Sequence, residues 1–93
     1  MVEIRFYGEL YEIVKVREYM IRISKDLTLY ELIEILSRKL GVEISSILLD
    51  ENGRIKGRYA ILINGSAVKD YDARSVKIKD DDVIAILPPA VGG

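Results

Sequence analysis

Apolar and polar residues alternate at the start of the chain. In VEIRFY, positions 2, 4 and 6 are apolar, Glu3 and Arg5 are charged, and Tyr7 shares the face of the charged pair. This period of two predicts a half-buried strand over residues 2–7 whose charged face meets solvent. EYMIRI alternates in the same way and predicts a second strand, over residues 18–23, that pairs back on the first. The glycine-led segment between them, GELYEIVKV, is expected to form a loop or a single helical turn.

The segment TLYELIEILSRKLG carries a helical period instead. Thr28 and Glu31, three residues apart, match a capping box, and Gly41 suits the left-handed conformation in which many helices end. The sequence therefore predicts one amphipathic helix between Thr28 and Gly41. Its apolar residues recur at helical spacing, at Leu29, Leu32, Ile33, Leu36 and Leu40.

Turn signals divide the second half of the chain. SILLDENGRIKGRY contains an Asn-Gly pair and predicts an irregular connection with a short strand at residues 47–49. YAILI, followed by Asn64-Gly65 and SAV, predicts a hairpin, because both turn residues tolerate a positive φ. VIAIL is apolar on both faces from Val83 to Leu87, which predicts a central strand that is buried on both sides.

The order of these elements predicts the fold class. Strand, strand, helix, strand, strand, strand gives an α+β domain in which one main helix packs on one face of a mixed sheet of four to five strands. The natural arrangement sets the last strand beside the first and parallel to it. Ubiquitin-like β-grasp domains have this layout, so we expect residues 1–87 to form a β-grasp domain and residues 88–93 to form an extended tail.

Charge and composition narrow the possible partners. The chain has 93 residues and a net charge of −1, with 14 basic and 15 acidic side chains interspersed. It therefore has no basic field for nucleic acid phosphates and no polybasic run for anionic lipid. No segment approaches the roughly 18 apolar residues that span a bilayer. We expect a cytoplasmic protein that binds neither nucleic acid nor a membrane.

The absence of cysteine and histidine restricts the chemistry of the chain. It has no thiol nucleophile, no imidazole base and none of the ligands that zinc or copper sites favour. The acidic run at residues 80–82 is expected to be a solvated loop, because a hard cation needs six or more oxygens from several segments. We therefore predict no metal, no bound cofactor and no enzyme activity of the chain on its own.

The chain ends in LPPAVGG, which carries the most specific chemical signal. Pro88 and Pro89 lack amide hydrogens, so they stop a sheet ladder and direct the residues after them into an extended path. Six residues at about 3.3–3.6 Å each can reach roughly 20 Å, enough to enter a cleft on another protein. Gly92 and Gly93 lack Cβ atoms and can pass through a narrow channel. The alternative is a frayed terminus without function.

A terminal carboxylate is a poor electrophile and must be activated before it reacts. An ATP-dependent partner can convert the Gly93 carboxylate to an acyl adenylate, and a sulfur donor protein can then leave a thiocarboxylate. Because the chain has no cysteine, it can carry sulfur only at this end.

These features resemble a known family. The first strand VEIRFYGEL, the ILING hairpin and the ending VIAILPPAVGG resemble the MoaD-like small subunit of molybdopterin synthase, in the MoaD/ThiS family of ubiquitin-like sulfur carriers. The resemblance spans nearly the whole chain. Related chains usually have Gly-Asp before the last strand, where this one has Asp81-Asp82, so either the turn differs or Asp81 takes a glycine-like conformation.

The resemblance implies a reaction cycle and its partners. An E1-like adenylyltransferase (MoeB-like) adenylates the terminus with ATP, and sulfur is loaded as a thiocarboxylate. The tail then enters the large subunit of molybdopterin synthase (MoaE-like), whose active site transfers the sulfur to cyclic pyranopterin monophosphate. By position, Gly93 would bear the sulfur. The expected partner-binding residues are Tyr7, Ala67, Leu87, Pro88, Pro89, Ala90, Val91 and Gly92, with Tyr7, Leu87 and Ala67 forming an apolar patch.

Two other functions remain open at this point. The same activated Gly93 could be joined to lysines of other proteins, as in archaeal ubiquitin-like modifiers, or could supply sulfur for tRNA thiolation. Alternatively, the chain could be a β-grasp interaction module whose tail is never activated. The metal finally served, molybdenum or tungsten, is also left open.

Overall fold

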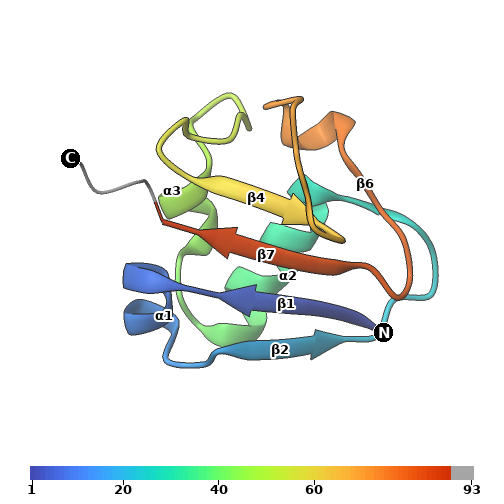
Figure 1. Cartoon of the computed structure of the whole chain (residues 1–93), viewed down its shortest axis with the longest axis horizontal. Helices are drawn as coiled ribbons and strands as arrows, with labels where there is room; N and C mark the ends of the chain where they lie inside the picture. Colours follow the sequence, from blue (N-terminus) through green and yellow to red (C-terminus); the bar gives the residue numbers. More distant parts are fainter. Residues whose placement is uncertain (89–93) are drawn as a thin grey trace.

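Five strands form one mixed sheet in the order β2-β1-β7-β4-β5 (Figure 1). The computed structural model describes residues 1–88. β7 runs parallel to β1 and antiparallel to β4, so the first and last strands lie side by side, as predicted. The strands are β1 (Val2–Phe6), β2 (Glu18–Ile21), β4 (Ala60–Ile63), β5 (Ser66–Ala67) and β7 (Val83–Leu87).

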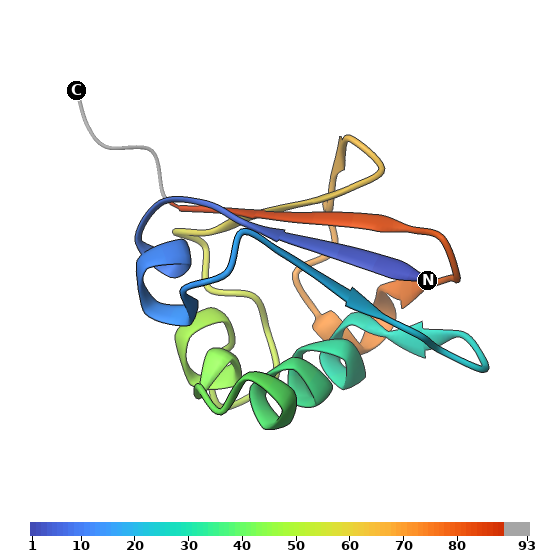
Figure 2. The same ribbon diagram turned by 90° about the horizontal axis from the view of Figure 1, so that it is seen from below.

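The helices cover one face of this sheet. Figure 2 shows the sheet from its edge, with the helices gathered below it. A separate two-stranded ribbon pairs β3 (Leu27–Thr28) with β6 (Lys77–Ile78). The arrangement is the predicted β-grasp fold. The helices are α1 (Gly8–Val14), α2 (Leu29–Leu40), α3 (Ile44–Leu48) and a short 3-10 turn, η1 (Ala73–Ser75).

The core lies between the sheet and α2. Ile4 and Phe6 of β1, and Ile84 and Ile86 of β7, are at most 1% exposed, because every second side chain of a strand points to the same face. The outer side chains of β7, at the alternate positions, are only half-buried. The prediction that this strand is buried on both sides is therefore wrong for its outer face, although its central place in the sheet is confirmed. The apolar face of α2 that meets the sheet consists of Leu29, Leu32, Ile33 and Leu36.

Both predicted ends of α2 are confirmed. The Glu31 amide donates to Thr28 Oγ1 at 3.1 Å, and the Thr28 amide donates to Glu31 Oε1 at 2.9 Å, which completes the capping box. Gly41 ends the helix at φ 69°, in the left-handed region that costs glycine no Cβ strain.

Two other segments differ from their predictions. The glycine-led segment after β1 forms the seven-residue helix α1, in which Leu10 and Val14 are buried four residues apart. The expected strand at residues 47–49 is wrong, because Ile44 and Leu48 are buried on one side of the helix α3 instead. None of the helices within residues 1–88 is long and apolar enough to cross a membrane.

The tight turns follow their sequence signals. Asn64 and Gly65 have φ values of 51° and 86°, as the predicted hairpin between β4 and β5 requires. Asp81 has φ 70°, so it takes the glycine-like conformation that was one of the two expected outcomes. The polar side of this turn faces the start of the chain, since the Met1 amine lies 2.9 Å from Asp80 Oδ1 and 3.0 Å from Asp81 Oδ1.

Candidate functional site

The face of the sheet opposite the helices, called the open face, carries three of the predicted partner-binding residues. Tyr7 follows Phe6, which pairs with Ile86, so Tyr7 lies beside Leu87 at one end of the sheet. Tyr7 is 42% exposed and Leu87 is half-buried. Ala67 is exposed on β5, and two strand widths separate it from Leu87. The structure thus brings Tyr7 and Leu87 together, and Ala67 joins them only through intervening residues.

The intervening residues complete an apolar patch across three strands. Ala60 pairs with Leu87, while Leu62 pairs with both Ala85 and Ala67, so that all of them share the open face. None of the helices in the described part of the chain covers this face (Figure 2). We define the apolar patch as Tyr7, Ala60, Leu62, Ala67, Val83, Ala85 and Leu87.

Ala60, Leu62, Val83 and Ala85 were missed at the sequence level. Their signal was present, because they alternate with core isoleucines along β4 and β7. The missing information was the strand order, since only the pairing of β4 with β7 makes the two sets contiguous. A contiguous apolar patch outside the core is a candidate surface for binding another protein.

The other half of the open face carries charged side chains of β1 and β2 together with the exposed Met20. Register places Glu18 beside Arg5, and Met20 beside Glu3, on the neighbouring strands β1 and β2. The Arg5 guanidinium donates to the Glu3 carboxylate, and this hydrogen bond raises the pKa of Arg5 further. The charged pair of Arg5 and Glu3 therefore borders the apolar patch on its β1 side. The two halves of the open face thus differ in chemistry.

Pro88 marks the point at which the chain leaves the sheet. It is half-buried and lines a groove of about 240 Å³ together with Tyr59, Ala60 and Tyr71. This groove adjoins the apolar patch, because Ala60 belongs to both. Pro88 is thus the last predicted site residue that the structure places. The predicted positions Pro89, Ala90, Val91, Gly92 and Gly93 lie outside the described residues.

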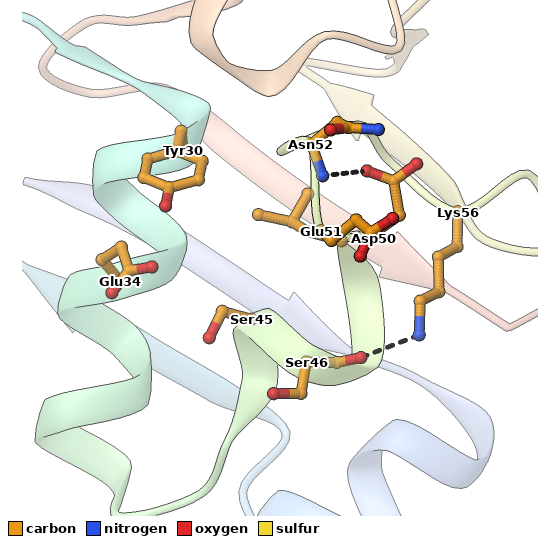
Figure 3. A pocket seen from close by; sticks show the side chains of 9 residues that line it. Tyr30, Glu34, Ser45, Ser46, Asp50, Glu51, Asn52 and Lys56 are labelled. Atoms are coloured by element: carbon orange, nitrogen blue, oxygen red, sulfur yellow. Dashed lines mark hydrogen bonds between the residues drawn. The ribbon is translucent and has the colours of Figure 1, made fainter.

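A larger hollow, of about 570 Å³, lies in the helical layer between α2 and the segment after α3 (Figure 3). Its lining includes Tyr30 and Glu34 of α2, and Lys56 opposite them. The Lys56 ammonium donates to the carbonyl oxygen of Ser46 at 2.9 Å, so this cation is already used to hold the loop. The hollow contains none of the predicted site residues, and we locate the candidate site at the open face and the end of β7.

The acidic run at residues 80–82 lies in the turn before β7. Within residues 1–88, no group of three or more acidic side chains is placed to hold a metal ion. In the acidic run, Asp82 accepts hydrogen bonds from the Lys79 amide at 2.8 Å and from the Asn64 side chain at 2.9 Å. The hydrogen bond from the Met1 amine to Asp80 lowers the pKa of that carboxyl. These carboxylates therefore serve the turn before β7.

Comparison with known proteins identifies the family. The model of the ThiS family matches residues 4–93, which is nearly the whole chain. The chain belongs to the ThiS family of ubiquitin-like sulfur carriers. Members of this family are small carriers and not catalysts themselves. The match extends through all of the positions beyond Pro88, so the Gly-Gly pair falls within the part of the chain that the ThiS family shares.

The individual relatives of this ThiS-family chain are proteins described in different ways. It is 28% identical to small archaeal modifier protein 3 of Haloferax volcanii, over 99% of this chain and 98% of that protein. It is 32% identical, with a TM-score of 0.58, to a chain in the complex of subunits 1 and 2 of molybdopterin-converting factor from Helicobacter pylori, over 99% and 97% of the two chains. A chain of the Amycolatopsis orientalis BexX/CysO complex shares the fold, with a TM-score of 0.79 and 18% identity over the full length of both.

Proposed function

We propose that this chain is the sulfur-carrying small subunit of a molybdopterin synthase. In this role Gly93 carries a thiocarboxylate and donates its sulfur to cyclic pyranopterin monophosphate, for a molybdenum or tungsten cofactor. The observation that carries the proposal is the family match, which runs through Gly93 on a β-grasp domain. The apolar patch beside the end of β7 supports it, because a carrier must dock on other proteins to be loaded and unloaded.

The chemistry of loading follows from the carboxylate. An oxygen of the Gly93 carboxylate attacks the α-phosphate of ATP on an E1-like adenylyltransferase, and pyrophosphate leaves. A sulfide equivalent from a sulfur donor protein then attacks the acyl carbon, and AMP leaves. The thiocarboxylate sulfur then bonds to the pterin, water attacks the acyl carbon, the carbon–sulfur bond to Gly93 breaks, and the Gly93 carboxylate is regenerated. Every catalytic side chain in this cycle belongs to a partner, which is consistent with a carrier that has neither cysteine nor histidine.

The large subunit is the partner that fits the apolar patch. The Helicobacter pylori relative, at 32% identity, was solved in a complex of subunits 1 and 2 of molybdopterin-converting factor. By analogy, we expect a MoaE-like large subunit to bind the side of the open face that contains Leu87 and to receive the tail beyond Pro88. Tyr7 and Ala67 would lie at opposite margins of this contact.

A second function is favoured by a different relative. Small archaeal modifier protein 3 matches 99% of this chain at 28% identity. A protein modifier would use the same adenylate but would transfer the Gly93 acyl group to a lysine amine, forming an isopeptide bond and releasing AMP. Alternatively, the thiocarboxylate could supply sulfur for tRNA thiolation.

Intact-mass spectrometry of the protein from its native host separates these functions. A carrier should show replacement of one terminal oxygen by sulfur, whereas a modifier should appear in isopeptide-linked adducts with other proteins. Deletion of Gly93 should abolish pterin sulfuration while the unfolding temperature stays unchanged. A second variant carries one alanine after Gly93, so it keeps every native residue and blocks only the terminal carboxylate. It should lose sulfuration as well. Retained sulfuration in the deletion variant would exclude Gly93 as the residue that carries the sulfur.

A further inference from the structure

Gly8 lies at the junction where β1 ends and α1 begins, beside the last residues of β7. The Tyr7 amide donates to the Ile86 carbonyl oxygen at 3.3 Å, which extends the contact between the two strands up to this junction. Gly8 itself has φ 60°, in the left-handed region that side chains with a Cβ rarely adopt. Backbone conformation alone would therefore favour glycine at this position.

Space gives a second and independent reason for this glycine. A Cβ atom on Gly8 would lie 2.5 Å from Pro88 Cγ, 3.1 Å from Pro88 Cβ and 3.2 Å from Pro88 Cδ. The proline ring thus occupies the volume that a side chain at position 8 would need. Gly41 and Gly65 also have positive φ values, but a Cβ at either position would meet no described atom within 4 Å. Gly8 combines the left-handed conformation with close packing against the chain exit.

A hydrogen bond holds the surroundings of Gly8 in place. The Tyr59 hydroxyl donates to Glu9 Oε1 at 3.0 Å, and the two residues are 50 positions apart in the sequence. Tyr59 is 7% exposed and precedes β4, whereas Glu9 follows Gly8 in α1. Because β7 lies between β1 and β4, this bond connects the elements on both sides of β7 at the end where Pro88 leaves. Burial, and then the bond to Glu9, raise the pKa of Tyr59, so the hydroxyl keeps its proton at neutral pH.

We propose that Gly8 is a positioning residue for the carrier end: by leaving room for the Pro88 ring, it fixes the direction in which the chain leaves β7. Tyr59 and Glu9 support this role by holding α1 against the strand end. The inference rests on the proposed function, because direction matters only if Gly93 must reach a foreign active site. Proline fixes its own φ, and Pro89 follows immediately, so a displaced Pro88 ring would redirect the segment after it. Small misplacements of a reacting group can cost up to about 100-fold in rate.

Gly8→Ala tests the inference, with Gly41→Ala as the matched control. Both substitutions place a Cβ at a left-handed position, but only the first displaces Pro88. With the cognate adenylyltransferase, ATP–pyrophosphate exchange should show kcat reduced about 10-fold or more for Gly8→Ala, with KM changed less than about twofold. Gly41→Ala should match the wild type. Equal rates for the two variants would overturn the inference.

The Pro88→Ala background provides a second test, because alanine removes the ring atoms Cγ and Cδ. In this background, Gly8→Ala should reduce exchange by no more than about twofold, since the two effects are coupled through one contact. The same loss in both backgrounds would mean that Gly8 acts on folding and not through Pro88.

Nuclear magnetic resonance tests the geometry without any partner. The wild-type protein should show a nuclear Overhauser contact between Gly8 Hα and the Pro88 ring, and Gly8→Ala should shift the Pro88 resonances while Gly41→Ala leaves them in place. Absence of the contact would overturn the inference. If the contact is present but the wild type supports no exchange with the adenylyltransferase, the proposed function fails and the packing stands.

Discussion

Glu31 shows how one side chain links the start of a helix to the pH dependence of stability. Its carboxylate accepts a hydrogen bond from the Thr28 amide at 2.9 Å, and this bond lowers the pKa of Glu31 in the folded protein. A lowered folded-state pKa means that the charged form stabilises the fold. This contribution is complete above the ordinary value of 4.5 and is lost as the pH falls through the lower folded-state pKa.

Glu31→Gln should therefore be less stable than the wild type at pH 7, and the difference should close as the pH falls below about 4. Glutamine keeps an acceptor for the Thr28 amide but loses the charge near the positive end of α2. Urea unfolding at a series of pH values measures the difference. Thr28→Ser, which keeps the hydroxyl of the capping box, should retain the wild-type profile. A difference that does not vary with pH would show that the charge of Glu31 contributes nothing.

Gly8 marks a limit of prediction at the level of single residues. The capping box could be predicted because Thr28 and Glu31 are three positions apart, and the Asn64-Gly65 turn because its φ values are a local requirement. The close packing of Gly8 depends on Pro88, which is 80 positions away in the sequence and reaches it only through the parallel pairing of β1 with β7. No local pattern contains that information.

One side chain, that of Asn64, adds to the antiparallel pairing that joins the β4–β5 hairpin to β7. Asn64 Oδ1 accepts from the Val83 amide at 2.9 Å, and Asn64 Nδ2 donates to Asp82 Oδ1 at 2.9 Å. The Asn64 amide also donates to the Val83 carbonyl oxygen at 2.8 Å. The turn residue thus fixes where β7 begins against β4, in addition to reversing the chain.

Asn64→Gly separates these two roles. Glycine accepts φ 51° more readily than asparagine does, so the substitution removes the side-chain bonds without adding backbone strain. We expect the free energy of unfolding to fall by about 1 kcal/mol, because two partly exposed hydrogen bonds are lost. Asn52→Ala is the control, since the hydrogen bonds that Asn52 makes within residues 1–88 use its backbone amide and carbonyl, and its effect should stay within about 0.5 kcal/mol. Chemical denaturation measures the free energy of unfolding of both variants. Equal effects would show that the Asn64 side chain does not strengthen the attachment of the hairpin to β7.

Elements with strong periodicity or a clear turn signal could be predicted, whereas the short elements that lack both could not. The twelve residues of α2 repeat the helical spacing often enough to exclude a strand. The five residues of α3 do not, and an apolar run at residues 47–49 fits a strand equally well until burial of Ile44 and Leu48 on one side decides for the helix. β3 and β6, of two residues each, exist only because Leu27 meets Ile78 in the folded chain.

Sheet order gives the open face two chemically different halves. The apolar patch lies over β7, β4 and β5, while the pair of Arg5 and Glu3 borders it on β1. The LPPAVGG ending and the family that it resembles predicted a carrier end at Gly93, and strand alternation placed Tyr7 on the outer face. The extent of the patch was not predictable, because alanines such as Ala60 and Ala85 become part of a surface only when their strands are paired.

Leu87→Asp tests whether this patch is the docking surface for the large subunit. The residue is half-buried on the outer face, outside the core, so the variant should remain folded by circular dichroism and thermal unfolding. In the complex, a carboxylate would have to be buried among apolar groups without a partner, which is strongly unfavourable. We expect the affinity for the cognate large subunit to fall at least about 30-fold, the loss typical of a central contact residue.

Met20→Asp is the matched control for this experiment, since it introduces the same charge on the same face of the sheet. Met20 is 49% exposed on β2, beyond the charged strip of β1, and lies outside the apolar patch. We expect its affinity to stay within about threefold of the wild type, because rim positions contribute little to binding. Isothermal titration calorimetry with the purified large subunit measures both variants. Unchanged affinity of Leu87→Asp would exclude the patch as the docking surface, and equal losses in both variants would show that the partner does not distinguish the two halves.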